Sequence, residues 1–131
     1  MHMSSYNLKR HIELLNCQKN VLSQGKSFLK QNKTEFWELK KYDQAVNSHI
    51  AWEKRFKIAS LIETFLNKEI NAVEFHDLVF ELRRNYLDES NKFRSRLVSG
   101  EIKEFFPKKE SYKIEGFLSF LYFECENFEM N

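Results

Sequence analysis

The chain is short of the residues that end helices and form turns. Of its 131 residues, three are glycine and one is proline. Sandwiches, barrels and linker-rich proteins need many more turn residues, so this shortage favours a few long helices. It also excludes a glycine-rich phosphate-binding loop, because such a loop needs several glycines close together.

Cysteines and long apolar runs are scarce as well. Cys17 and Cys125 are too far apart and too few to form a disulfide framework or a four-ligand zinc site. No apolar run approaches the roughly 20 residues that span a bilayer, and the amino terminus lacks the apolar core of a secretory signal. We therefore expect a soluble protein without membrane contacts in a reducing compartment, either the cytoplasm or an organelle interior.

Neither sign of charge is in large excess, but the charges are unevenly distributed. Lys and Arg number 21 and Asp and Glu number 19, which gives a formal net charge of +2. Residues 1–55 hold ten basic and five acidic side chains, a net charge of +5, whereas residues 56–131 hold eleven and fourteen, a net charge of −3. A basic amino-terminal segment therefore precedes an acidic remainder, and this asymmetry has functional content.

Apolar residues at helical spacing predict five or so helices. The first runs from about residue 5 to residue 23, and Gly25 ends or bends it. Thr34 can cap the next helix, which continues without glycine or proline. The apolar pattern there is irregular, so one long helix and two helices broken near Asn47 and Ser48 both fit it.

The second half of the chain has a clearer pattern. Residues 58–66 carry a regular apolar stripe, and Asn71 begins a helix in which Glu74 completes a capping-box pattern. This helix continues to Gly100, and Ser111 begins the last one. We predict an all-α fold, a single-domain antiparallel helical bundle of four to five helices that comprises residues 1–131.

The residues that could support catalysis are not grouped. His76 and Asp77 are adjacent, so on a helix they point about 100° apart and do not form an oriented acid–base pair. Cys125 lies between Glu124 and Glu126, whose charges raise the pKa of a thiol rather than activate it. No cofactor or metal-ligand pattern is present, so we expect a non-enzymatic protein without a cofactor or metal.

The carboxy-terminal segment combines carboxylates with aromatic side chains. Fixed carboxylates beside Phe and Tyr suit a basic protein surface, because the aromatic rings provide anchors and the charges provide steering. An ordinary core helix with a charged outer face is the alternative. The residues that we expect to bind a protein partner are Glu124, Glu126, Glu129, Tyr122, Phe120 and Phe123.

The basic amino-terminal segment predicts a different kind of surface. Its lysines are interleaved with aromatic residues, a combination that can hold single-stranded nucleic acid. The residues that could do so are Lys33, Lys40, Lys41 and Trp37. No recognised nucleic-acid motif accompanies them, so a solvated charged face is the alternative.

Two stretches resemble the self-protective colicin-like immunity family of the colicin D type. In residues 61–75, an apolar helix that ends in Phe-Leu is followed by a short polar turn, Ile-Asn-Ala, and then Glu-Phe. Residues 117–129 are similar to the family's ending, in which a Leu-Tyr-x-x-Cys-Asp-x-Phe phrase recurs. The resemblance covers about residues 57–129, so the acidic part (residues 56–131) is the immunity-like bundle and the basic helical segment (residues 1–55) has no counterpart in short family members.

The resemblance implies an inhibitor that neutralises a toxin nuclease by placing carboxylates where the substrate phosphates would bind. The carboxylates that it assigns to this contact are Glu124, Glu126 and Glu129, followed by Glu63, Glu74 and Asp77. The slightly positive total charge departs from the acidity expected of such an inhibitor. A structural subunit or an oligomer, which would bury surface Phe and Trp by self-association, is a further class that fits the composition.

Overall fold

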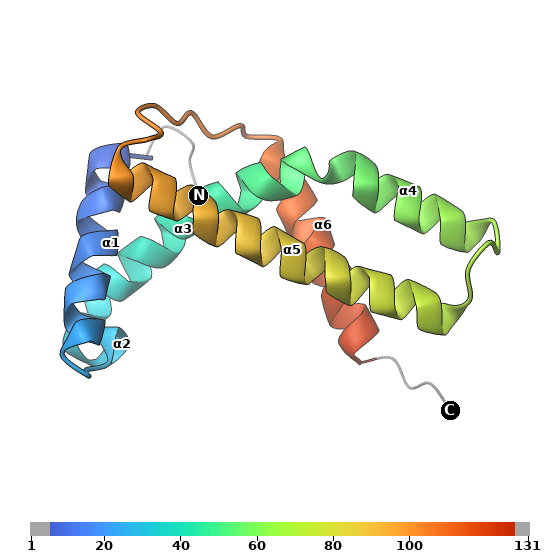
Figure 1. Cartoon of the computed structure of the whole chain (residues 1–131), viewed down its shortest axis with the longest axis horizontal. Helices are drawn as coiled ribbons and strands as arrows, with labels where there is room; N and C mark the ends of the chain where they lie inside the picture. Colours follow the sequence, from blue (N-terminus) through green and yellow to red (C-terminus); the bar gives the residue numbers. More distant parts are fainter. Residues whose placement is uncertain (1–5, 128–131) are drawn as a thin grey trace.

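The computed structural model describes residues 6–127, which fold into helices joined by short connections (Figure 1). The helices are α1 (Leu8–Ser23), α2 (Phe28–Gln31), α3 (Lys33–Glu53), α4 (Arg55–Leu66), α5 (Ala72–Ser99) and α6 (Ser111–Glu126). The predicted all-α fold is confirmed. The described part of the chain has six helices rather than four to five, because it forms the short α2 and because α3 and α4 are separated at Lys54.

The long helices run in opposite directions along the molecule. Figure 1 shows α3 followed by α4 along the long axis, with α5 returning in the opposite direction. Helix α1 lies across one end of α3, and α6 crosses α5 near the middle of the molecule. The hairpin of α4 and α5 therefore projects beyond the other helices.

Helix α3 is the centre of the packing. It contributes residues to each of the three clusters of buried apolar side chains. The first joins Ile50 and Ala51 to Leu82, Tyr86 and Leu118, the second joins Ala45 and Val46 to Leu97 and Phe105, and the third joins Leu39 to Leu14 and Phe28. The basic amino-terminal helices and the acidic carboxy-terminal helices thus pack on the same central helix.

Small side chains let neighbouring helices approach α3 closely. Ala45, Ser48 and Ala51 recur every three residues and are fully buried. Helix α6 packs against α3 more extensively than any other pair of helices does. Because a larger side chain at these positions would meet a close-packed neighbour, we regard this small-residue face as the contact that sets the helix spacing.

The helix ends follow the local sequence in part. Asn71 Oδ1 accepts a hydrogen bond from the Glu74 N–H at 2.8 Å and the Glu74 carboxylate accepts one from the Asn71 N–H, which confirms the capping box. Gly100 ends α5 with a left-handed φ of 82°, as predicted. Thr34 is not a cap, because α3 already begins at Lys33 with Asn32 at the cap position.

The break within the second predicted helix occurs at Lys54, not near Asn47 and Ser48. Lys54 is buried, and its Nζ donates a hydrogen bond to Glu89 of α5 at 2.7 Å. Burying a lysine is costly unless its charge is paired, and Glu89 supplies the pair. This partner lies 35 residues away in the chain, so local sequence does not reveal it.

Several large apolar residues of the helices are exposed. Leu66, in the predicted stripe of residues 58–66, faces solvent, and so do Leu22, Leu78 and Phe117. For the hairpin, the reason is its position, since the tip of α4 and α5 extends past the helices that would cover its outer faces (Figure 1).

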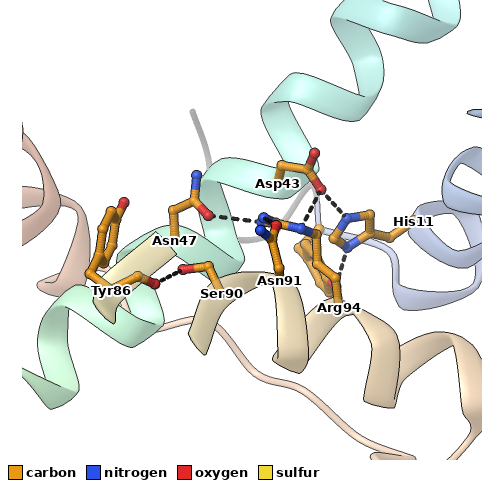
Figure 2. Close-up of polar contacts among 8 residues, drawn as sticks. His11, Asp43, Asn47, Tyr86, Ser90, Asn91 and Arg94 are labelled. Atoms are coloured by element: carbon orange, nitrogen blue, oxygen red, sulfur yellow. Dashed lines mark hydrogen bonds and ion pairs between the residues drawn. The ribbon is translucent and has the colours of Figure 1, made fainter. Parts of the chain in front are cut away.

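A buried polar network ties α1, α3 and α5 together (Figure 2). The fully buried His11 places its Nε2 2.8 Å from an Asp43 oxygen and its Nδ1 2.9 Å from the Tyr6 hydroxyl. Burial, with help from Asp43, raises the pKa of Tyr6, so its hydroxyl keeps its proton. Because the Asp43 carboxylate can only accept, the Nε2–H of His11 donates to it. Arg94 of α5 donates to Asn47 at 2.8 Å and lies 3.9 Å from Asp43.

We predict that Asp43→Ala lowers the free energy of unfolding by about 2–3 kcal/mol, because it leaves the buried Nε2 of His11 without its acceptor and removes the carboxylate 3.9 Å from Arg94. Urea denaturation measures the change. Glu13→Ala is the matched control: it removes an exposed carboxylate from an i,i+3 pair with Arg10, and we expect a loss of at most about 0.5 kcal/mol. Equal effects of the two substitutions would show that the network does not stabilise the helix packing.

Candidate functional site

Carboxylates gather on the α4–α5 hairpin and on α6. Residues 58–82 and 114–127, which we call the acidic region, hold eight Asp and Glu side chains and one lysine, a net charge of −7. Because the whole chain carries +2, the remainder carries +9. The carboxylates are Glu63, Glu69, Glu74, Asp77, Glu81, Glu115, Glu124 and Glu126, and all except Glu115 are exposed. Arg83, Arg84 and Lys113 border these ranges, and residues 58–84 with 113–127 carry a net charge of −4.

An apolar cavity of about 210 Å³ lies inside the acidic region, where α4, α5 and α6 meet. It is lined by Phe65, Ala72, Phe75, His76, Leu121, Glu124 and Cys125. The rings of Phe65 and Phe75 stack with centroids 4.3 Å apart and join the two arms of the hairpin. The cavity thus places the carboxylate of Glu124, a predicted partner contact, beside apolar walls.

Two of the predicted aromatic contacts are open to solvent. Phe120 and Phe123 on α6 are 59% and 60% exposed. Glu126 and Glu124 are exposed on the same helix. Large exposed apolar side chains beside charges are typical of a surface that binds another molecule.

Tyr122 differs from the other predicted contacts, because its ring packs within the protein. Arg83 of α5 lies over the ring at 4.0 Å from its centroid, and Phe80 meets it edge-on at 4.9 Å. Tyr122 therefore joins α6 to α5 while its side chain stays half-exposed, and its contact with a partner stays a prediction. Glu129 lies outside the described residues.

The other carboxylates that the family resemblance names, Glu63, Glu74 and Asp77, lie at different places in the structure. Glu74 forms the capping box of α5, and Asp77 is exposed one turn further along this helix. Glu63 lines a different groove, between α4 and α6. The structure therefore groups Glu124 with the cavity and Glu126 with the exposed aromatic rings, and it leaves Glu63 apart.

His76 and Cys125 hold α5 and α6 together. The His76 Nε2 hydrogen-bonds to the backbone carbonyl oxygen of Cys125, and this oxygen can only accept, so Nε2 carries the proton. Burial and the charge of Glu124 raise the pKa of the Cys125 thiol, which keeps it protonated. The thiol therefore has the character of an apolar side chain in the wall of the cavity.

Sequence spacing missed one oriented acid–base pair, His11 and Asp43. The two residues are 32 positions apart, so no motif search along the chain joins them. Both ring nitrogens of His11 are used within the protein and the ring is fully buried, so neither nitrogen reaches a substrate. We therefore assign this pair to folding.

Two further searches cover the described part of the chain. Between residues 6 and 127, no three His, Cys, Asp or Glu side chains are grouped closely enough to hold a metal ion. No helix in that range is both long enough and apolar enough to cross a membrane.

The predicted nucleic-acid contacts lie together on one face of α3. Lys33, Trp37, Lys40 and Lys41 recur at intervals of three, four, seven and eight residues, and all four are exposed. Trp37 is 55% exposed, and its ring meets the ring of Phe36 in a T-shaped arrangement with centroids 5.1 Å apart. The arrangement thus presents one aromatic ring among three lysines.

Comparison with known proteins gives no match. No protein family, no curated protein and no solved structure matches the chain. The resemblance to the colicin D type of immunity family therefore stays a prediction that rests on the residues quoted above.

We predict that replacing Phe120 and Phe123 together by Ser leaves the free energy of unfolding within about 1 kcal/mol of the wild type, because both rings are exposed. Leu118→Ala on the same helix removes a buried side chain of the first core cluster, and it should cost about 2–5 kcal/mol. Urea denaturation of the two variants checks this. A large loss from the Phe substitutions would mean that these rings serve the fold instead of a partner.

Proposed function

We propose that the protein is a non-enzymatic binding protein whose acidic region captures a basic protein partner. The observation that carries this proposal is the exposure of Phe120 and Phe123 beside Glu124 and Glu126, next to an apolar cavity. In the described residues, neither ring belongs to a buried apolar cluster or packs against one. They supply apolar contact area, and the carboxylates supply charge complementarity.

Charge makes a basic partner the best match. A region of net charge −7 attracts a positively charged surface over a distance of about one Debye length, roughly 8 Å at physiological salt. The negative carboxylates also disfavour an acidic partner, because placing like charges together in an interface costs several kcal/mol. A nuclease surface that binds phosphates is basic and therefore fits this description.

The specific form of the proposal is an immunity-like inhibitor that neutralises a toxin nuclease. It is supported by the resemblance, whose second stretch, residues 117–129, contains the exposed rings and both carboxylates. Carboxylates held on the rigid helix α6 can take the places of substrate phosphates without rearranging. A cognate toxin encoded beside this protein is the partner to test first.

The test is capture of the partner by immobilised protein. We expect wild-type protein to retain one stoichiometric basic partner, and Glu124→Lys with Glu126→Lys to weaken the complex at least about tenfold, because two attractive contacts become repulsive. Titration calorimetry on the purified complex measures the affinity. Circular dichroism of the free variant confirms that α6 is still folded.

The matched control reverses two exposed carboxylates outside the acidic region, Glu13 and Glu53, to lysine. It makes the same change in total charge, so it separates a local contact from a general loss of acidity. Retention by both variants at wild-type affinity would show that the acidic region is not the binding surface.

The exposed face of α3 favours a second candidate function, binding of single-stranded nucleic acid. Trp37 offers a ring on which a base can stack, and Lys33, Lys40 and Lys41 surround it with positive charge. The +9 of the chain outside the acidic region points in the same direction.

If this second function is real, a fluorescent single-stranded RNA should bind at low salt with an affinity that falls steeply as salt rises. Trp37→Ala should weaken binding by about 1–3 kcal/mol through the loss of stacking. Leu29→Ala, which removes another exposed apolar side chain, should leave the affinity unchanged. Fluorescence anisotropy that does not change at low salt would exclude this function.

A further inference from the structure

A second groove runs between α4 and α6, largely within the acidic region, but Phe120, Phe123, Glu124 and Glu126 do not line it. Its volume is about 500 Å³, and it is lined by Arg55, Ile58, Ala59, Ile62, Glu63, Leu66, Asn67, Ile114 and Phe117. Leu66 is 71% exposed and Phe117 is also exposed, so two large apolar side chains of the groove lie in water. Covering them would stabilise the protein, since burial of apolar surface is favourable.

The groove carries one charge of each sign, both on α4. Arg55 and Glu63 are eight residues apart, which is about 12 Å along a helix, and they lie on the same face. In the described residues neither one forms an ion pair. The guanidinium of Arg55 donates a hydrogen bond to the Trp52 carbonyl oxygen at 2.9 Å and lies over the rings of Trp52 and Phe56, 4.1 Å and 4.5 Å from their centroids. An oppositely charged partner is therefore missing at both positions within residues 6–127.

Ala59 lies midway between these two charges. It lines the groove, it is exposed, and its small side chain allows another helix to approach closely. If a second α4 lies antiparallel across Ala59, residue 55 of each helix faces residue 63 of the other. A twofold axis that passes between the two Ala59 residues then forms two Arg55–Glu63 ion pairs, one at each end of the contact.

We propose that the groove is occupied by the α4 helix of a second copy of this chain, in an antiparallel symmetric dimer. Contacts between Arg55 and Glu63 form at both ends, and Ala59 packs against its own counterpart at the centre. Each α4 lies in the groove between α4 and α6 of the other copy, so that Leu66 and Phe117 become buried. An interface of this kind is isologous, and it closes without leaving a further surface for growth.

Charge complementarity selects a second copy over an unrelated helix. A foreign helix has to supply an acidic and a basic side chain in reversed order at the same eight-residue spacing. The α4 helix of another copy supplies both by symmetry, together with the apolar Phe56 and Leu66 that α4 exposes. Phe120 and Phe123 do not line this groove, so dimer formation leaves the proposed partner contacts free.

The test measures the mass of the purified chain by sedimentation equilibrium over a range of concentrations. We expect wild-type protein to dimerise, and Arg55→Glu or Glu63→Arg alone to raise the dimer dissociation constant about tenfold or more, because each places like charges together at both ends. Lys57→Glu, an exposed charge reversal on α4 that does not line the groove, should leave the dissociation constant unchanged.

Mixing provides the decisive comparison. Equal amounts of the Arg55→Glu and Glu63→Arg chains should form a mixed dimer, since acidic positions then face basic ones, and the doubly swapped chain should dimerise on its own. Wild-type protein that stays monomeric at every concentration would overturn the proposal. So would a mixture or a double swap that dimerises no better than the single variants, because the loss would then come from misfolding and not from the pairing of charges.

Discussion

The close packing of helix α3 against its neighbours is the contact on which the rest of the structure depends. Ala45, Ser48 and Ala51 are fully buried and small, so α5 and α6 can lie directly against the α3 backbone. The same helix reaches the amino-terminal helices through Leu39 and through Asp43, which holds the buried His11. One helix therefore fixes the relative positions of a basic part and an acidic part that differ strongly in charge.

This arrangement also explains why so much apolar surface is open. Helix α3 ends at Glu53, and the α4–α5 hairpin continues beyond it with only α6 crossing nearby (Figure 1). The stripe on residues 58–66 has the periodicity of a core helix, but only Ile58 is buried. The apolar residues left over form the walls of the cavity beside Glu124 and of the groove beside Arg55, and both of our binding proposals arise from this incomplete coverage.

Local chemistry could be predicted from the sequence, and long-range contacts could not. The Asn71–Glu74 capping box and the left-handed Gly100 depend on residues within one turn, so the sequence identifies them directly. Lys54 interrupts a helical pattern, and its partner Glu89 is 35 residues away. The exposure of Leu66 is likewise set by the place of the hairpin and not by its own periodicity.

For the candidate surfaces, too, features within one helix could be predicted from the sequence and contacts between helices could not. Lys33, Trp37, Lys40 and Lys41 belong to one helix, so their common face follows from their spacing. Residues 56–131 carry a net charge of −3, and the ranges 58–82 and 114–127 carry −7 because the basic residues of this part lie mainly between them in the sequence. Tyr122 lies on the same helix as Phe120 and Phe123, and its contacts with Arg83 and Phe80 of α5 are long-range and could not be predicted from the sequence.

The central claim is that the acidic region is the surface that holds a protein partner. Hydrogen–deuterium exchange on the free protein and on its purified complex tests it most directly, because it locates the contact without a substitution. The account predicts that the partner slows exchange in residues 114–127 and near the tip of the α4–α5 hairpin, and leaves residues 33–41 of α3 unchanged. Slowed exchange confined to residues 33–41, with α6 unaffected, would contradict it.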